Sequence, residues 1–345
     1  MGRLLALASL LALGCGRVAF ETSTSWDATT PDGTGNGDAA IDARHEKSCD
    51  GLPASCGPAG LASCCDSPIV PGGSFFRGYD AALDGAYSDM TSPATVSTFR
   101  LDRYEVTVGR FRQFVADGMG TQQNPPAAGA GARSLNGLTN QAGWDPFWSS
   151  NLAADSIQLH AGLNCQAAYQ TWTDAPGANE NRPIVCISWY EAMAFCTWDG
   201  GFLPTETEWN YAASGGSEQR AYAWSNPPGD TTSDCTVANY GASNWPTTAC
   251  TAAGARDVGS SSPAGDGRWG QSDLGGNAAE WVLDWYASPY PSPCQDCATV
   301  GSASFREQRG GDYGDPPSYM RASGRLTYPA SPRSIFASVR CARTP

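Results

Sequence analysis

Cysteine is the residue that most restricts how this chain can fold. The sequence has 13 cysteines in 345 residues but only two histidines, His45 and His160. Cys15 stands apart, because it directly follows an apolar leader, and twelve cysteines remain. An even number of cysteines in an exported chain favours disulfides. Two histidines also exclude any metal site that is built from three histidine side chains.

The N-terminus has the pattern of an export signal. It begins MGRLLALASLLALGCGR, in which Arg3 precedes an apolar run, residues 4–13, that is too short to span a bilayer. Small residues lead up to Cys15, as in bacterial lipoprotein signals. We therefore expect residues 1–14 to be a signal peptide and Cys15 to carry the lipid that anchors the protein in the bacterial cell envelope. The alternative is an ordinary secretory signal that is cut nearby, which also predicts export.

Composition restricts the fold class and the partners. With 40 glycines and 24 prolines, the chain favours a loop-rich fold over a helical bundle. Apolar residues make up 41% of the chain, which is enough for a sizeable core. The net charge of -13 leaves no basic face for nucleic acid, so we exclude that class of partner.

The mature chain divides into three parts. Residues 15–48 are rich in Asp, Thr, Ser, Gly and Ala, which predicts a flexible acidic tether. Residues 49–67 contain four closely spaced cysteines: Cys49, Cys56, Cys64 and Cys65. Four cysteines could bind zinc, but an exported segment without histidine favours a small knot with two disulfides. Residues 68–343 are expected to form one globular domain.

Local patterns predict a few short elements in that domain. The stretch GGSFFRG is expected to be a strand, and VSTFRLDRYEVTVGRFRQFVADG changes from alternating to helical apolar spacing. A helix is predicted over SWYEAMAFCTWDGG, with Ser188 as its N-cap. Another helix is predicted after Thr205, where Glu208 completes a capping box. Beyond residue 215 we expect short strands and long turns and no helix. Within that range, the alternating Trp281, Leu283 and Trp285 suggest a strand with one buried face.

The middle of the domain carries few regular signals. Residues 119–182 are rich in Gly, Ala, Asn and Pro, and a long irregular stretch is unusual in a domain. By proximity in the sequence, Cys165 is expected to pair with Cys186 and to staple this stretch. Cys235 is expected to pair with Cys250 on the same grounds.

Four stretches together resemble the formylglycine-generating enzyme family, also called the sulfatase-modifying factor domain. They are RPIVCISWYEAMAFCTWDGGFLPTETEWNYAASGG, SDLGGNAAEWVLDWY, RGGDYGDPPSYMRASGR and ASVRCAR, in this order. The resemblance covers roughly residues 70–343. It implies an α+β fold that is irregular, loop-rich and related to C-type lectins. It also implies a disulfide between Cys196 and Cys341, which match the family's paired cysteines.

The resemblance also implies calcium. In DLGGNAAEW, the family's ligand positions correspond to the Asp273 side chain, the carbonyls of Gly276 and Ala278, and the Glu280 side chain. Calcium prefers such oxygen ligands. The alternative is a turn whose acids only cap backbone N–H groups.

A second calcium site is only partly matched. It would use Asn239 and the carbonyl of Tyr240, but its acidic partner further along the chain has no clear counterpart.

The family's copper site is not matched. Its oxidases bind copper with two cysteines that correspond to Asp315 and Met320 here, and the preceding turn serine corresponds to Asp312. Carboxylate and thioether do not replace a thiolate pair for Cu(I), so copper is not expected. The motif Cys294-x-x-Cys297 could be a redox or metal pair, but a loop rich in Pro and Ser outside the cell favours a local disulfide.

Polar side chains remain around the expected pocket. An acid pair such as Asp312 and Asp315 could carry out general acid–base chemistry. Arginine and aromatic side chains on loops often recognise ligands. The alternative is that Arg321, Arg325 and Arg340 form structural ion pairs with buried acids. The pocket candidates are Asp312, Tyr313, Tyr319, Arg321 and Arg325.

We therefore expect a lipid-anchored protein whose domain binds a peptide, a glycan or a partner protein on a calcium-stabilised scaffold. The first alternative is an enzyme, either a divergent oxidase that acts on protein cysteine or one that uses Asp312 and Asp315. The second alternative is a purely structural surface protein.

Overall fold

A computed structural model describes residues 46–80, 89–133, 135, 143–241, 250, 254–301 and 303–345. All of them belong to one unit, Arg44–Pro345. The predicted signal peptide, Cys15, His45 and the predicted tether up to residue 45 lie outside the described residues. In the described ranges, no helix has both the length and the apolar character that a membrane crossing requires.

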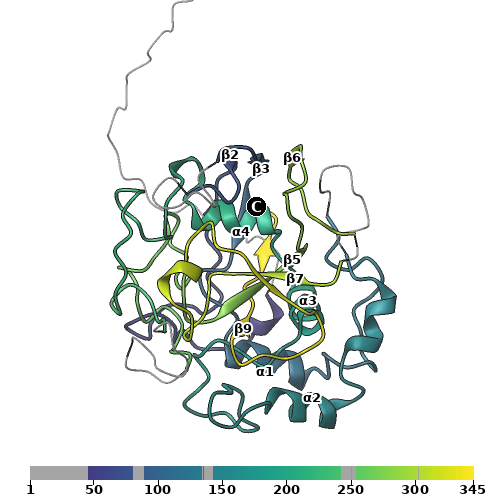
Figure 1. The fold of residues 1–345 in the computed structure, drawn as a ribbon. Coiled ribbons are helices and arrows are strands. Elements are labelled where there is room, and N and C mark those ends of the chain that lie inside the picture. The colour runs from purple at the N-terminus through teal and green to yellow at the C-terminus, as the bar shows by residue number, and fades with distance from the viewer. Residues whose placement is uncertain are drawn as a thin grey trace, which may run out of the picture. The chain divides into compact units, whose positions relative to one another are not determined.

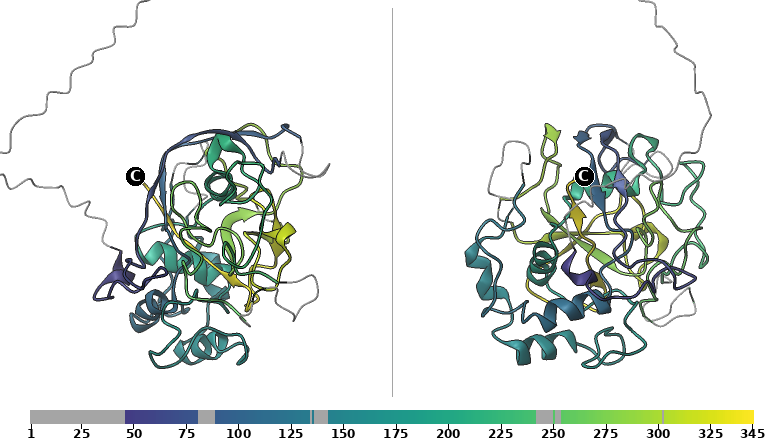
Figure 2. Two further views of the ribbon diagram at one scale, coloured as in Figure 1. Left: turned by 90° about the vertical axis from the view of Figure 1, so that its left-hand side faces the viewer. Right: turned by 180° about the vertical axis from the view of Figure 1, so that it is seen from behind.

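Short strands and helices are joined by long loops (Figure 1). The strands of the described residues are β1 (Ile69–Val70), β2 (Gly73–Phe76), β3 (Pro93–Val96), β4 (Phe99–Leu101), β5 (Ala279–Trp285), β6 (Cys294–Gln295), β7 (Arg306–Arg309), β8 (Leu326–Tyr328), β9 (Ala337–Ser338) and β10 (Ala342–Arg343). They form sheets in the orders β1-β4-β10, β2-β3-β6 and β8-β7-β5-β9. The α-helices are α1 (Val108–Ala116), α2 (Ser156–Leu163), α3 (Trp189–Trp198) and α4 (Glu206–Ala213), and short 3-10 turns span Lys47–Cys49, Pro146–Asn151, Gly216–Glu218 and Pro317–Tyr319. Strands β2, β3 and β6 lie at one end of the unit, and α1 and α2 lie at the other end (Figures 1 and 2).

Strand β5 organises the core. It pairs antiparallel with β7 and parallel with β9. Trp281 and Leu283 lie in a hydrophobic cluster with residues of α1 and α3, whereas Val282 lies in a second cluster with residues of α4 and β1–β4. The predicted strand is confirmed, but the expectation of a single buried face is wrong, because elements cover β5 on both sides.

The predicted helix starts are confirmed. Ser188 accepts a hydrogen bond from the N–H of Glu191 at the start of α3, and the Glu191 carboxylate accepts one from the N–H of Ser188. Thr205 and Glu208 form the same reciprocal box at the start of α4. These local pairs need only residues three apart, which is why the sequence reveals them.

Helix α2 lies inside the stretch that was expected to be irregular. Asp155 caps it by accepting from the N–H of Gln158 at 2.9 Å. Only Leu159 and Leu163 of this helix are buried. The apolar residues Ile157, Leu159 and Leu163 do not keep a helical spacing throughout, so the sequence pattern does not separate this short helix from a loop.

All twelve described cysteines form disulfides. The pairs are Cys49–Cys65, Cys56–Cys64, Cys165–Cys186, Cys196–Cys341, Cys235–Cys250 and Cys294–Cys297. They include the four pairs that the sequence and the family resemblance suggested. The Cys-rich segment holds two disulfides and not the alternative zinc site. Glu46 lies near Cys49 and Cys65, but both of these sulfurs are committed to their own bond.

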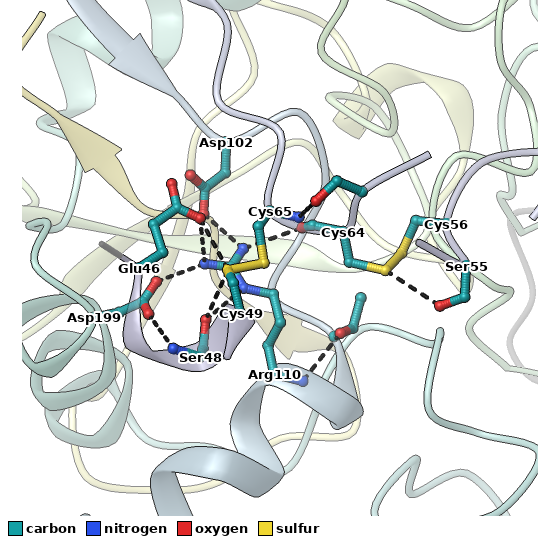
Figure 3. The surroundings of a disulfide bond; sticks show 12 residues. Glu46, Ser48, Cys49, Ser55, Cys56, Cys64, Cys65, Asp102, Arg110 and Asp199 are labelled. Carbon is teal, nitrogen blue, oxygen red and sulfur yellow. Dashed lines mark hydrogen bonds and ion pairs between the residues drawn. A yellow bond between two sulfur atoms is a disulfide. The ribbon is translucent and has the colours of Figure 1, made fainter. Parts of the chain in front are cut away.

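A buried charge network joins the Cys-rich segment to the domain (Figure 3). Arg110 donates to Asp102 at 2.9 Å and to Asp199 at 2.6 Å. Arg343 forms ion pairs with the same two carboxylates. Ser48 is fully buried, and its N–H donates to Asp199 at 2.8 Å. The packed region therefore begins before the first cysteine of the segment, and the last residues of the predicted tether belong to it.

Candidate functional site

Three loops meet near the N-terminal end of β5. They are residues 239–241, 273–280 and 310–320. Asn277 N donates to the carbonyl of Asn239 at 2.8 Å, and Tyr313 N donates to the carbonyl of Asn277 at 3.2 Å. These bonds place residues 310–320, the segment predicted from the resemblance to match the copper positions, beside both segments predicted to match the calcium positions.

Glycines allow the loops to approach so closely. A Cβ on Gly241 would lie 2.3 Å from the carbonyl oxygen of Gly314. Gly276 has a φ of +81°, and a Cβ there would lie 2.5 Å from the carbonyl oxygen of Asn239. Backbone contacts at these distances leave no space for a side chain, so the loops depend on glycine at both positions.

Asp312 and Asp315 form an acid pair within this junction. Asp312 N donates to Asp315 Oδ2 at 3.2 Å, and Gly314 N donates to Asp312 Oδ1 at 2.6 Å. Burial, followed by the neighbouring Asp315 carboxylate, raises the pKa of Asp312 well above its usual range. Burial also raises the pKa of Asp315, while the hydrogen bond from Asp312 opposes that rise. Both carboxyl groups are therefore harder to ionise than exposed ones, and a buried acid pair of this kind can exchange a proton with a substrate.

The other residues of the segment differ in exposure. Met320 is fully buried and packs in a cluster with Tyr222 and Ala238. Tyr313 is also buried, with its ring 5.3 Å from that of Phe336. Tyr319 is exposed. Asp315 offers a hard carboxylate and Met320 a buried thioether, so these two positions lack the pair of soft thiolates that the resemblance implies for Cu(I).

Arg321 and Arg325 form ion pairs with different acids. Arg321 Nη1 lies 2.6 Å from Asp80 Oδ2. Arg325 donates to both oxygens of Glu307 at 2.7 Å. The alternative of structural ion pairs therefore describes these two side chains, and they do not converge on the acid pair.

The matched calcium residues lie among buried carboxylates. Glu280 accepts from Arg340 Nη2 at 2.6 Å and from Trp209 Nε1 at 2.7 Å. Asp273 accepts from the N–H of Gly259 at 2.5 Å. Burial is the first cause that raises the pKa of Asp273 to about 6.

Sequence reasoning missed Glu105, which faces the same place. It accepts from Ala278 N at 3.0 Å and from Asn277 Nδ2 at 2.9 Å. Burial, then the charges of Asp273 and Glu280, raises its pKa well above the usual range. In the sequence, the only indication of its role is that Glu105 stands between the apolar residues Tyr104 and Val106.

The donor set at this junction fits a cation by charge. Arg340 faces three buried carboxylates, those of Glu105, Asp273 and Glu280. At the partly matched site, Asn239 Oδ1 is buried and has no hydrogen-bond partner within the described residues. Oxygen ligands and excess negative charge are what Ca²⁺ requires.

Comparisons with known proteins agree with these motifs. The family model for the sulfatase-modifying factor enzyme 1-like domain matches residues 56–345. The formylglycine-generating enzyme of Streptomyces coelicolor is 31% identical over 296 residues, which cover 79% of this chain and 87% of that protein. The inactive C-alpha-formylglycine-generating enzyme 2 of Bos taurus is 27% identical over 263 residues, which cover 68% and 75%.

The fold is also found in solved structures. PvdO from Pseudomonas aeruginosa superposes with a TM-score of 0.55 at 21% sequence identity, covering 82% of this chain and 95% of that chain. The expected loop-rich α+β fold of formylglycine-generating enzymes, related to C-type lectins, is confirmed. The chain belongs to the sulfatase-modifying factor enzyme 1-like domain family.

Proposed function

We propose that the protein is a lipid-anchored envelope protein whose domain binds a ligand without oxidase chemistry. The observation that carries this proposal is the state of the cysteines: all twelve within the described residues are disulfide-bonded. No described thiol is therefore left to hold Cu(I). A relative that is named inactive supports a role of this kind for a chain with this fold.

The ligand is a peptide, a glycan or a partner protein, presented to a scaffold that calcium stabilises. Rigid loops fixed by disulfides and glycine contacts suit recognition, because little conformational entropy is lost on binding. The membrane partner is the lipid on Cys15, which follows the signal pattern in the sequence.

A second candidate function is acid–base catalysis by Asp312 and Asp315. It is favoured by the burial of the pair, which raises the pKa of both carboxyl groups. A general acid must keep its proton near the working pH. This candidate needs no thiol and no metal ligand from the segment.

The absence of oxidase chemistry is tested with copper and a cysteine-containing peptide. We expect the wild-type protein to bind no Cu(I) and to leave the peptide thiol unconverted under oxygen, by mass spectrometry. The matched variant D315C/M320C, which restores two thiols, is expected to bind Cu(I). Conversion of the peptide by the wild type would overturn the non-oxidase proposal.

Calcium is tested by thermal unfolding of the full chain. Calcium at about 100 times its Kd should raise the melting temperature by roughly 5 °C relative to EDTA, because it offsets repulsion among the buried carboxylates. D273N should reduce this shift, since Asn tolerates the positive φ of 59° at this position and keeps one oxygen donor but carries no charge. Magnesium is the control ion. An equal melting temperature in calcium and in EDTA would count against Asp273 and Glu280 as ligands.

The lipid anchor is tested by metabolic labelling with an alkyne palmitate. The wild-type chain should incorporate the label and sediment with membranes. C15A should lose both properties, while C49A, which changes a cysteine outside the signal, should keep the label. Labelling that persists in C15A would show that Cys15 is not the lipidated residue.

The acid pair is tested through the pH dependence of stability. A raised carboxyl pKa stabilises the folded state below the unfolded pKa, and this stability is lost as pH rises through the folded pKa. D312N imitates the protonated form, so it should melt like the wild type near pH 4 and at a higher temperature at pH 8. D257N is the charge control, because its side chain is 57% exposed. Equal destabilisation of D312N at both pH values would mean that Asp312 holds no proton.

A further inference from the structure

A pocket of about 320 Å³ opens beyond the C-terminal end of β5, away from the three loops at its N-terminal end. Its lining includes Arg77, Thr91, Tyr286, Ser288, Tyr290 and Arg325. The volume lies at the lower end of the range for small-molecule sites, roughly 300 to 1,000 Å³. None of the residues matched to the family's copper or calcium positions lines it.

Two guanidinium groups flank one tyrosine ring in this pocket. The Cζ atoms of Arg77 and Arg325 lie 4.5 Å and 4.0 Å from the centroid of the Tyr290 ring. Arg325 also lies 4.3 Å from the centroid of Tyr286. Tyr290 is held by its own hydroxyl, which donates to Glu206 at 3.0 Å. The stack fixes both guanidiniums at the pocket wall.

Arg77 has no carboxylate partner of its own within the described residues. Its η nitrogens donate to Cys297 Sγ and to the carbonyl of Pro291, and its buried Nε has no hydrogen-bond partner there. The charges of Asp284 and Glu307 reach Arg77 without a direct ion pair, and a buried cation that lacks such a pair is costly. An anion in the pocket would offset that cost.

Among the buried groups around the pocket, positive charge is in excess, and Asp89 is a further, exposed carboxylate of the lining. Arg325 shares Glu307 with Arg309, so one carboxylate serves two guanidiniums. Burial, as the first cause, raises the pKa of Glu307 to about 7, and the hydrogen bond and charge of Arg325 oppose that rise. The buried charged groups of this region are Arg77, Arg306, Arg309 and Arg325 against Glu206, Asp284 and Glu307.

The rest of the lining is polar and suits a hydroxylated ligand. Thr91, Ser92 and Ser288 offer hydroxyl groups, and Asp89 is an exposed carboxylate that can accept hydrogen bonds from a ligand hydroxyl. Tyr286 offers an aromatic surface. A polyol ring that carries one oxyanion matches these groups better than an apolar molecule or a cation does.

We propose that this pocket binds an acidic sugar, with its carboxylate or sulfate directed at Arg77 and Arg325. Carboxylate and sulfate both carry negatively charged oxygens that accept paired hydrogen bonds from a guanidinium group. This inference rests on the proposed binding role and gives it a ligand class. The pocket proposal and the non-oxidase proposal can be contradicted separately, because the copper assay does not involve this pocket.

The test is a saturation-transfer NMR titration of the full chain in detergent with glucuronate, glucose 6-sulfate and glucose. We expect one or both acidic sugars to bind and neutral glucose to bind at least fivefold more weakly. S288D, which places a carboxylate at the exposed mouth, should weaken the acidic sugar about fivefold or more through charge repulsion. S288N is the matched control and should bind like the wild type.

The different ligands and variants of this titration distinguish the possible outcomes. Preference for glucuronate over the sulfate identifies the carboxylate as the recognised group, and the reverse preference identifies the sulfate. Equal affinity for glucose and the acidic sugars would overturn the proposal, and so would equal binding by S288D and S288N. N-acetyl-glutamate amide binding as tightly as glucuronate would show that the pocket recognises an acidic side chain and not a sugar.

Discussion

Buried arginine side chains hold together a structure in which loops make up most of the chain. A loop has few neighbouring strands to bond its carbonyls, and an unpaired buried carbonyl is costly. The guanidinium group offers five donors, so one arginine can serve several loops. Arg340 pairs with Glu280 and also donates to the carbonyls of Asp102, Arg103 and Ser272. Arg309 does the same for Ala322 and Gly324 while it pairs with Glu206.

Because arginine side chains donate hydrogen bonds to these loop carbonyls, charge is distributed unevenly through the interior. Each buried arginine needs a carboxylate, but the pairs do not balance locally. At the N-terminal end of β5, three carboxylates face Arg340. Beyond its C-terminal end, the guanidiniums outnumber the carboxylates around Tyr290. The same strand thus separates a region suited to a cation from a region suited to an anion.

The sequence revealed the features that depend on neighbours along the chain. Ser188 and Thr205 were predictable as helix caps, and Cys165 and Cys186 as a pair, because their partners are close in sequence. The family motifs added Cys196 and Cys341, which no local rule could pair. Glu105 escaped prediction, because its contacts with Asn277 and Ala278 cross more than 170 residues.

The candidate site was predictable only as a segment. The motif located residues 310–320, but it did not predict which of their side chains are buried or which residues they contact. Met320 turns into the core and Arg325 turns to Glu307, whereas Asp312 stays beside Asp315. Such choices depend on which loop packs opposite, here residues 239–241 and 273–280, and sequence spacing carries no information about that.

The disulfide between Cys196 and Cys341 gives the maturation of the chain a fixed order. Its cysteines are 145 residues apart, whereas Cys56 and Cys64 are separated by 8. The short loop can close as soon as both of its cysteines are exposed to an oxidant, but Cys196 must wait for a cysteine 145 residues further along the chain. Until then its thiol is open to exchange with every earlier cysteine. The segment that carries Cys341 therefore decides whether α3 is locked into the correct covalent framework, and a chain that lacks this segment keeps an unpaired thiol at its core.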